Sequence, residues 1–333
     1  MTKNLKVFSE GIISAVGNTP LIKLKKASEI TQCNILGKAE FLNPGQSIKD
    51  RAALFIINEL KKNNISDSNV IVEGTGGNTG IGLTLIGSAM GYKTVIVMPN
   101  DQSEEKIQTL RYLGAEVVLT EKAPYTDKKN YIQLSKKIAE ERNAIWSNQF
   151  DNLANRKAHI ETTSEEIWEQ TQGKIDAFIC AIGTGGTLAG NSLGLKRKRK
   201  AIKIYCADPY GSGMYSYIRK GVSKSACSSI TEGIGQSRIT KNIEGVDFDG
   251  AFKVSDQTAL NIIYDLIKEE GLYLGPSSGI NIGGAIKLAK HLGPNNTIVT
   301  VLCDYANRYA NKIFNYDFLK SKDLIFPDWI TKC

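Results

Sequence analysis

The chain is organised around one stretch, Asn43-Pro44-Gly45-Gln46-Ser47-Ile48-Lys49-Asp50-Arg51. After it, apolar residues recur at helical spacing, at Ala53, Ile56, Ile57 and Leu60. This pattern predicts an amphipathic helix with residues 43–46 as the turn before it. Lys49 falls in the first turn, where the partial positive charge of a helix N-terminus disfavours a cation. Two interpretations are open: a solvated lysine paired with Asp50, or a lysine that forms a Schiff base.

From residue 35 onward, short apolar runs alternate with helical periodicity, which predicts an α/β protein with mostly parallel sheets. The length of 333 residues suggests two domains. Strands are predicted at 70–73, 94–98, 117–119, 144–146, 177–182, 203–207 and 297–302. Helices are predicted at 81–90, 104–113, 128–142, 164–172, 256–270 and 282–291, and in a run through Leu188 and Leu193. Residues 209–250, which show little periodicity, are expected to be loops over a site.

The charge balance does not favour a nucleic-acid partner. The formal net charge of +8 comes from 42 basic and 34 acidic residues, which is a mild imbalance for this length. The only dense basic block, residues 196–200, follows a predicted helix, precedes a predicted strand and has no interleaved aromatic residue. A solvated connection is therefore favoured over a nucleic-acid patch.

The cysteines and the N-terminus indicate a reducing compartment. Six cysteines stand at 33, 180, 206, 227, 303 and 333, and the two histidines are His159 and His291, so a zinc site of the usual spacing is not expected. Cys180, Cys206 and Cys303 lie in apolar runs and are interpreted as small buried hydrophobes. Residues 1–6 hold no apolar core of signal length and no stretch approaches 18 apolar residues, so no membrane partner and a cytoplasmic location are expected.

A glycine-rich loop, Gly183-Thr184-Gly185-Gly186-Thr187, follows the most apolar predicted strand and opens a helix. Such a loop offers backbone N–H groups and two hydroxyls to a phosphate dianion. It lacks the lysine of a P-loop, so a nucleoside triphosphate is disfavoured. A plain tight connection is an equally good interpretation of this loop taken alone.

Two further loops follow the same plan. In Gly74-Thr75-Gly76-Gly77-Asn78-Thr79-Gly80, a dinucleotide fingerprint would need glycine at position 79. The amides, the carboxamide and the hydroxyls suit a carboxylate and a phenolic oxygen better. In Gly275-Pro276-Ser277-Ser278-Gly279, the serines serve either as helix caps, which is favoured in isolation, or as donors to a ligand. Two histidines make a Ser-His-Asp site improbable.

Together these loops meet the needs of one cofactor, pyridoxal phosphate, which requires a phosphate cradle, an imine-forming lysine, an amide for its phenolic oxygen and a hydroxyl for its ring nitrogen. The chain resembles the cysteine synthase (O-acetylserine sulfhydrylase) and cystathionine beta-synthase family of pyridoxal-phosphate enzymes. The similarity runs from Val16-Gly17-Asn18-Thr19-Pro20-Leu21 through the three loops to Cys303-Asp304, and it includes Asn148-Gln149-Phe150 and Glu232-Gly233-Ile234-Gly235.

The resemblance implies fold-type II, the fold of the tryptophan synthase beta subunit, with two domains that each hold a mostly parallel sheet flanked by helices. Residues 1–45 and 153–333 would form the larger, cofactor-binding domain, and residues 46–152 the smaller, mobile, substrate-binding domain. A homodimer is expected on the same ground. Whether a serine acetyltransferase C-terminal tail docks in the site is left open.

The resemblance also implies roles for individual residues. Lys49 would hold the cofactor as an imine and move the substrate proton, Asn78 would face the phenolic oxygen and Ser277 the ring nitrogen. Gly183, Thr184, Gly185, Gly186 and Thr187 would bind the phosphate. The amino-acid carboxylate would be held by the asparagine loop and Gln149, that is, by Thr75, Gly76, Gly77, Asn78, Thr79 and Gln149. Glu232 is either a further substrate-binding residue or an ordinary solvated loop acid.

The expected reaction is β-replacement, which makes cysteine from an O-activated serine and sulfide through an aminoacrylate, because a neutral serine at the ring nitrogen disfavours long-lived carbanions. Cysteine or serine as substrate, with sulfide release or cystathionine formation from homocysteine, is the enzymatic alternative. A cysteine-synthase-like sensor or partner protein is the non-enzymatic one. Two departures from the family pattern bear on the substrate: Gly76 replaces a common serine, and Asp304-Tyr305-Ala306-Asn307-Arg308-Tyr309 replaces a usual Asp-Ser-Gly.

Overall fold

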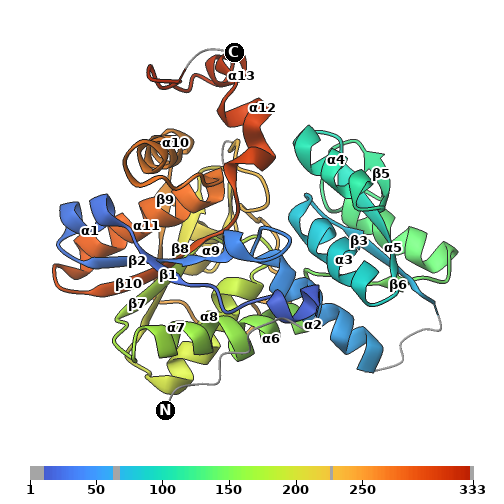
Figure 1. Ribbon diagram of the computed structural model, residues 1–333, viewed down its shortest axis with the longest axis horizontal. Helices are drawn as coiled ribbons and strands as arrows, with labels where there is room; N and C mark the ends of the chain where they lie inside the picture. Colours follow the sequence, from blue (N-terminus) through green and yellow to red (C-terminus); the bar gives the residue numbers. More distant parts are fainter. Residues whose placement is uncertain (1–10, 63–67, 226–227, 331–333) are drawn as a thin grey trace.

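The helix predicted after the Lys49 stretch forms as α2 (Lys49–Lys62), and it lies between two β-sheets in the computed structural model (Figure 1). The structure describes residues 11–62, 68–225 and 228–330. All four residues of the predicted apolar stripe are buried: Ala53, Ile56, Ile57 and Leu60. They pack with apolar residues of α3 (Asn78–Ala89), such as Leu83 and Ile86, so hydrophobic burial fixes α2 against the smaller sheet.

The larger sheet has six strands in the order β1-β2-β10-β7-β8-β9. Only the pairing of β1 with β2 is antiparallel. The strands are β1 (Leu21–Lys23), β2 (Asn34–Ala39), β10 (Thr297–Leu302), β7 (Ala177–Cys180), β8 (Lys203–Pro209) and β9 (Gly250–Val254). The central strands are β7, which is fully buried, and β10, which is buried except at Thr297, as expected for strands covered on both faces.

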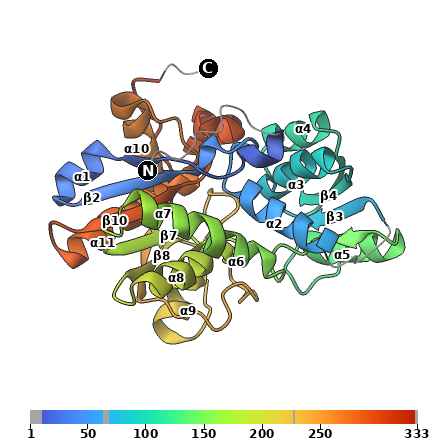
Figure 2. The ribbon, with the colours of Figure 1, turned by 60° about the horizontal axis from the view of Figure 1, so that its bottom comes forward.

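Helices cover both faces of this sheet. One face packs against α1 (Lys25–Thr31), α10 (Asp256–Asp265) and α11 (Pro276–Leu292). The other face packs against α7 (Ser164–Gln170), α8 (Gly186–Lys198) and α9 (Met214–Lys220). Neighbouring residues of β7 alternate between the faces, since Phe178 joins the α8 core and Ile179 the α11 core. Figure 2 shows α8 and α10 on opposite sides of β7.

The smaller sheet is parallel throughout, in the order β5-β4-β3-β6. Its strands are β3 (Val70–Gly74), β4 (Lys93–Pro99), β5 (Glu116–Thr120) and β6 (Ile145–Trp146). On one face, α3 and α4 (Glu104–Tyr112) pack with Ile96 and Met98; on the other, α5 (Tyr131–Glu141) packs with Val95 and Val97. Two mostly parallel sheets with flanking helices confirm the predicted fold class.

The remaining elements are short helices and helical turns that connect the parts around the two sheets. The run from α6 (Ala154–Ala158) passes through a π-helical turn, His159–Thr163, into α7. A second π-helical turn, Leu266–Glu270, continues α10. Three 3-10 turns cover Ile12–Ala15, Glu40–Leu42 and Ala306–Tyr309. After the last of these, α12 (Ala310–Ile313) reaches α4, where its Asn311 N–H donates to Glu105 at 2.8 Å. The following helix α13 (Tyr316–Lys320) lies further from α4 (Figure 1), and its Leu319 packs with apolar residues of α10.

Three predictions of local structure were wrong. The helix expected from residue 128 begins at Tyr131, because the Asn130 side chain accepts from the Ile132 N–H at 3.0 Å and caps it. The segment 209–250 is not all loop, because Asp208 accepts the Tyr215 N–H at 2.8 Å at the start of α9. The basic block is not simply a connection, since Lys196 to Lys198 form the last turn of α8, where cations complement the helix dipole.

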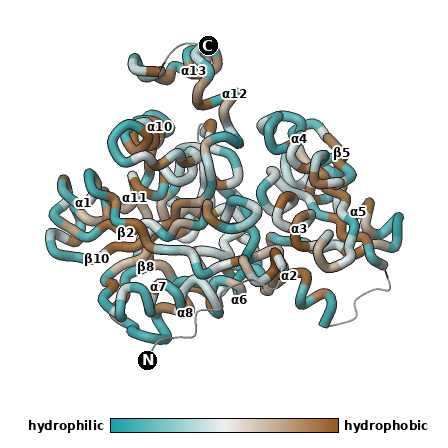
Figure 3. Tube along the Cα trace, viewed as in Figure 1, coloured by the Kyte–Doolittle hydropathy of each residue, from teal (hydrophilic) through white to brown (hydrophobic). Residues whose placement is uncertain are grey.

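The interior follows the hydropathy of the chain, with hydrophobic colour in β2 and hydrophilic colour in α4 (Figure 3). In the described part of the chain, no helix is long and apolar enough to cross a membrane. Cys180 and Cys206 are buried as predicted, whereas Cys303 is only partly buried. Burial raises the pKa of the Cys180 and Cys206 thiols well above the usual value, so they are not thiolates. Cys227, Cys333 and residues 1–6 lie outside the described residues.

Candidate active site

Lys49 is placed at the carboxyl end of β10. The Ile48 N–H donates to the Cys303 carbonyl at 3.1 Å, and Ser47 forms an antiparallel bridge with Asp304. Lys49 is half-buried at the first residue of α2. The structure shows no ion pair between Lys49 and Asp50, since one Asp50 oxygen accepts from the Gly45 N–H and the other is buried without a partner. The interpretation of Lys49 as a solvated partner of Asp50 is therefore wrong.

A buried ion network fixes the start of α2. Arg51 is 1% exposed and binds Glu40 at 2.7 Å and Glu166 at 2.6 Å, and Lys38 binds Glu166 at 2.6 Å. Two cations and two anions balance within the interior, which offsets the desolvation of each charge. Because Arg51 follows Lys49 by two residues, this network limits where the lysine can point.

The predicted phosphate loop joins β7 to α8 and cannot accommodate side chains at its glycines. A Cβ at Gly183 would lie 2.2 Å from the Gly233 carbonyl oxygen, and a Cβ at Gly186 would lie 2.1 Å from Asn155 Oδ1. Gly185 has φ 88°, in the left-handed region that favours glycine. The N-cap residue Gly185 offers α8 no side-chain acceptor, and the Gly186 N–H makes one long hydrogen bond to Thr184 Oγ1, at 3.4 Å. The result is a cradle of backbone amides suited to a phosphate.

The two threonines of this loop are held by neighbouring side chains. Asn155 Nδ2 donates to Thr184 Oγ1 at 2.9 Å, and His159 Nε2 lies 3.3 Å from Thr187 Oγ1. His159 is buried, and burial together with the nearby Arg51 charge lowers its pKa to about 3. A neutral imidazole thus positions Thr187 across the physiological pH range.

The asparagine loop lies between β3 and α3 and brings together the residues expected at the substrate carboxylate. Thr79 Oγ1 donates to Gln149 Oε1 at 2.5 Å, and Gln149 Nε2 donates to the Gly74 carbonyl at 3.2 Å. Thr75 Oγ1 accepts from the Gly77 N–H at 3.1 Å, and Gly77 has φ 128°. The loop is therefore preorganised, with Gln149 arriving from the segment after β6.

Gly76 faces Gln102. A Cβ at Gly76 would lie 3.0 Å from Gln102 Oε1, so the space that a serine side chain would use is bordered by a carboxamide. A serine at this position would require the Gln102 carboxamide to shift. Sequence inspection could not reveal this, because Gln102 belongs to the loop after the neighbouring strand β4.

Asn78, at the first residue of α3, is held by two side chains that the sequence did not identify. Its Nδ2 donates to Asp304 Oδ2 at 2.6 Å, and Arg308 Nη1 donates to its Oδ1 at 2.6 Å. Arg308 Nη2 also donates to the Gly45 carbonyl. The available signal was partial, because Asp304 is the aspartate of the usual Asp-Ser-Gly pattern and Arg308 lies beyond the three residues of that pattern.

The two serines of the third loop separate in role. Ser278 Oγ accepts from the Cys303 N–H at 2.9 Å and ties α11 to β10. Ser277 is 5% exposed. The Cys303 thiol accepts from Asn281 Nδ2 at 3.2 Å, and burial together with the Asp304 carboxylate raises its pKa to about 11. Ser277 and Ser278 therefore lie at the end of β10, where the Lys49 loop also docks.

Glu232 is not a solvated loop acid. Its carboxylate is 6% exposed and binds Lys106 at 2.7 Å and Lys312 at 2.5 Å, while Ser103 Oγ lies 3.3 Å away. Burial alone would raise the pKa of Glu232, but the two ammoniums outweigh it and hold the pKa below its usual value. Both oxygens are occupied, so an interaction of Glu232 with substrate requires the loss of an ion pair.

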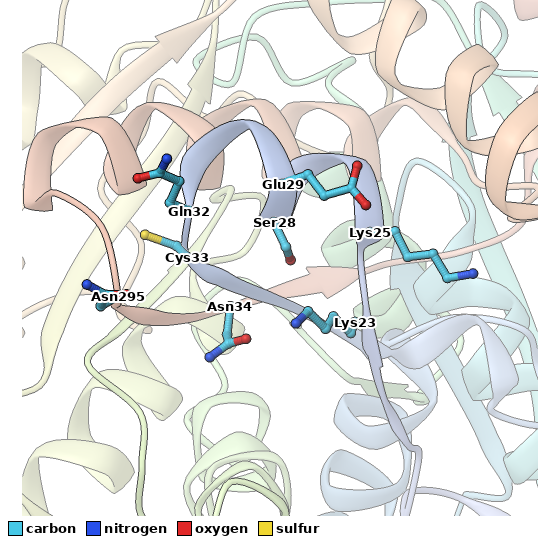
Figure 4. Close-up of a pocket in the computed structure, with 8 residues that line it drawn as sticks. All are labelled: Lys23, Lys25, Ser28, Glu29, Gln32, Cys33, Asn34 and Asn295. Carbon is cyan, nitrogen blue, oxygen red and sulfur yellow. The ribbon is translucent and has the colours of Figure 1, made fainter.

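A separate hollow of about 600 Å³ lies at the edge of the larger sheet, between α1 and β2 (Figure 4). Its lining includes Lys25, Gln32 and Asn34, and none of the loops described above reaches it. The hollow is open and polar, and we assign the chemistry to the loops instead.

A sequence profile described as "Pyridoxal-phosphate dependent enzyme" matches residues 12–304. The chain belongs to this family of pyridoxal-phosphate dependent enzymes. It is 49% identical to Cysteine synthase 1 of Neurospora crassa over 97% of this chain and 89% of that protein. It is 50% identical to Cysteine synthase 1 of Emericella nidulans over 95% of this chain and 88% of that protein.

Solved structures of this family show the same fold. The O-acetylserine dependent cystathionine beta-synthase of Helicobacter pylori superposes with a TM-score of 0.83 at 33% identity, over 92% of this chain and 98% of the other. A hydrogen sulfide-producing enzyme of Fusobacterium nucleatum superposes with a TM-score of 0.82 at 35% identity, over 92% of this chain and 100% of the other.

The residues present fit pyridoxal phosphate. The phosphate requires the glycine cradle at 183–187, which a Cβ would fill, and the aldehyde requires an amine such as that of Lys49. Both lie at the carboxyl ends of adjacent strands, because β7 pairs with β10 and the Lys49 loop docks at the end of β10. In open α/β sheets, ligands bind at this edge.

Proposed function

We propose that this pyridoxal-phosphate enzyme is a cysteine synthase, which makes cysteine from O-acetylserine and sulfide by β-replacement. The observation that carries the proposal is the convergence of Lys49, the 183–187 cradle and Ser277 on the carboxyl ends of β10 and β7. The near 50% identity to two fungal cysteine synthases over nearly the whole chain supports the choice of reaction.

Each loop has a part in holding the cofactor, which supplies an electron sink for bond breaking at the amino-acid substrate when bound. The 183–187 amides, at the N-terminus of α8, bind the phosphate. Asn78 Nδ2 donates to the phenolic oxygen. The Ser277 hydroxyl meets the ring nitrogen without placing a charge there, so protonation of the ring is not enforced.

Lys49 has two tasks in the proposal. Its amine would hold the cofactor, and when free it would remove the proton at the substrate Cα. The same amine later returns a proton to Cα when sulfide has replaced the acetate. Its partly buried position at the end of β10 allows both tasks, because the amine reaches the site while the buried Arg51 network fixes α2.

The substrate carboxylate binds the asparagine loop. The Thr75 hydroxyl, which accepts from the Gly77 N–H, keeps its own hydrogen for the carboxylate, and Gln149 Nε2 keeps one of its two. The Gly77 N–H and the Thr79 hydroxyl reach the carboxylate by exchanging their present partners. We propose that residues 46–152 move as the smaller domain, and that carboxylate binding closes this domain over residues 1–45 and 153–333. Closure excludes water and protects the reactive product of elimination from hydrolysis. Glu232 joins the two parts at the rim and reaches substrate only if Lys106 or Lys312 releases it.

A second candidate reaction has specific support. The two solved relatives are, by their descriptions, an O-acetylserine dependent cystathionine beta-synthase and a hydrogen sulfide-producing enzyme. The same Lys49 chemistry acting with homocysteine would form cystathionine, and acting on cysteine would release sulfide. A homodimer, a cytoplasmic location and docking of a serine acetyltransferase tail stay predictions.

Product analysis decides among these reactions. Purified protein is incubated with O-acetylserine, O-phosphoserine, serine or cysteine, with and without sulfide or homocysteine. We expect the highest kcat/KM for cysteine formation from O-acetylserine and sulfide. A higher kcat/KM for cystathionine formation or sulfide release would replace the proposal by the second candidate. An absorbance spectrum that none of these amino acids changes would indicate the non-enzymatic sensor.

A further inference from the structure

The Asn78 carboxamide is held at both ends by oppositely charged groups. Asp304 accepts from Nδ2 at 2.6 Å, and Arg308 donates to Oδ1 at 2.6 Å. The anion can only accept and the guanidinium can only donate, so this arrangement fits one of the two flip orientations of the carboxamide and opposes the other. The pair is 226 to 230 residues from Asn78 in the sequence.

Both charged groups are themselves fixed. Asp304 is fully buried, and its Oδ2 also accepts from the Tyr309 hydroxyl at 2.5 Å. Arg308 is 5% exposed, and its second terminal nitrogen donates to the Gly45 carbonyl. The guanidinium fork therefore joins the asparagine loop to the loop that carries Lys49.

The hydrogen-bond inventory leaves one donor free for a ligand. A carboxamide nitrogen has two hydrogens, and Asp304 uses one of those on Asn78 Nδ2. The second is available to a ligand oxygen. The positive charge of Arg308 at Oδ1 polarises the carboxamide, which strengthens this second N–H as a donor.

We propose that Asp304 and Arg308 are positioning residues that orient Asn78 toward the phenolic oxygen of pyridoxal phosphate and set its distance from Lys49. The inference rests on the proposed function, in which Asn78 meets that oxygen. It assigns a role to two residues of the 304–309 segment, of which Asp304 matches the family pattern, whereas the departure begins at Tyr305. Neither residue touches the cofactor; both act through Asn78.

The test measures cofactor affinity rather than turnover. The full chain is freed of cofactor and titrated, by fluorescence, with pyridoxal phosphate and with its 3-deoxy analogue, which lacks the phenolic oxygen. The variants are Arg308→Gln, Asn78→Ala and the double variant, with Arg308→Lys as the conservative change. Arg142→Gln is the matched control, because Arg142 forms an exposed ion pair with Glu116.

We expect Arg308→Gln and Asn78→Ala each to weaken pyridoxal phosphate binding by about tenfold, the size of one hydrogen bond to a polarised group. The double variant should be little weaker than either single variant, because the two residues act on one contact. The parent should bind the 3-deoxy analogue more weakly than pyridoxal phosphate, and neither substitution should weaken binding of the analogue further. Arg308→Lys should recover part of the affinity, and Arg142→Gln should bind like the parent.

The outcomes separate the two proposals. If Asn78→Ala binds pyridoxal phosphate like the parent, the assignment of Asn78 in the proposed function fails, and this inference fails with it. Two results would overturn only the positioning role while Asn78→Ala still weakens binding. In the first, the losses of affinity from Arg308→Gln and Asn78→Ala add in the double variant. In the second, Arg308→Gln weakens binding of the 3-deoxy analogue as much as binding of pyridoxal phosphate. Circular dichroism and thermal unfolding of each variant identify a loss that comes from misfolding, and in that case Arg308→Lys supplies the comparison.

Discussion

The Lys106 ammonium lies 2.7 Å from the Glu232 carboxylate and so joins α4 to the loop that also packs on the phosphate cradle. Lys106 is 1% exposed and lies over the Tyr309 ring at 4.2 Å. Lys312 completes the bridge from the C-terminal segment, and the Asn311 N–H donates to Glu105 at 2.8 Å beside it. These contacts connect α4, which covers the smaller sheet, to the Glu232 loop and the C-terminal segment beside the site.

Glu232→Gln should destabilise the protein, because it leaves two largely buried ammoniums without their counter-charge. We expect the free energy of unfolding to fall by about 2–3 kcal/mol, below the range for fully buried pairs because Lys312 is 20% exposed. Urea unfolding measures this, with Glu116→Gln, in an exposed ion pair, as a control that should cost less than about 1 kcal/mol. An increased KM for O-acetylserine with unchanged stability would instead indicate direct substrate contact.

Lys49→Ala should abolish turnover and the absorbance of lysine-bound cofactor while the protein stays folded. The side chain supplies the only amine assigned to the cofactor and to the Cα proton. Absorbance spectra and product formation measure the effect, and Lys61→Ala, in the last turn of the same helix, is the control. A Lys49→Ala protein that turns over substrate at the parental rate would refute the assignment.

Gly183→Ala should prevent normal cofactor binding. The new Cβ would lie 2.2 Å from the Gly233 carbonyl oxygen, a backbone atom that cannot rotate away. We expect at least an approximately tenfold loss of affinity, since the cradle must widen. Gly87→Ala in α3 is the control, because its Cβ would meet only ordinary contacts at 3.6 Å or more. Equal affinity of both variants for pyridoxal phosphate would place the phosphate elsewhere.

Asp50→Asn should change how stability depends on pH. Burial raises the pKa of Asp50 to about 7, so the folded state holds this proton more tightly than the unfolded state does. The corresponding stability is fully present below about pH 4 and is lost as pH rises to about 7. The amide variant has no such loss. The variant should therefore gain stability relative to the parent across this interval, by at most about 4 kcal/mol, with no further change above it.

Denaturant unfolding at pH 4, 5, 6, 7 and 8 measures this difference in stability. The substitution keeps the hydrogen bond of Asp50, because the asparagine carbonyl oxygen accepts the same Gly45 N–H. Asp176→Asn, at a half-exposed carboxylate, is the control. A difference between Asp50→Asn and the parent that does not depend on pH would contradict the raised pKa.

Much of the fold followed from local patterns. The alternation of apolar runs with helical periodicity predicted seven strands, β3 to β8 and β10, within about two residues, because strands covered on both faces are apolar. It did not predict β1, β2 and β9. The helix predicted at 256–270 forms with these bounds, because Ser255 caps its start and Gly271 ends it. The short α9 was missed because its start depends on Asp208, whose role no local pattern reveals.

The sequence by itself determined the parallel α/β fold, the three loops after strands and the unusual place of Lys49 at a helix start, because backbone propensity and burial act over a few neighbouring residues. Only the tertiary structure decided which side chains meet. Asn78 with Asp304 and Arg308, and Glu232 with Lys106, are partners across more than a hundred residues. Such pairs depend on how the parts around the two sheets pack against each other. This packing brings together side chains that are far apart in the sequence, so local sequence patterns cannot predict them.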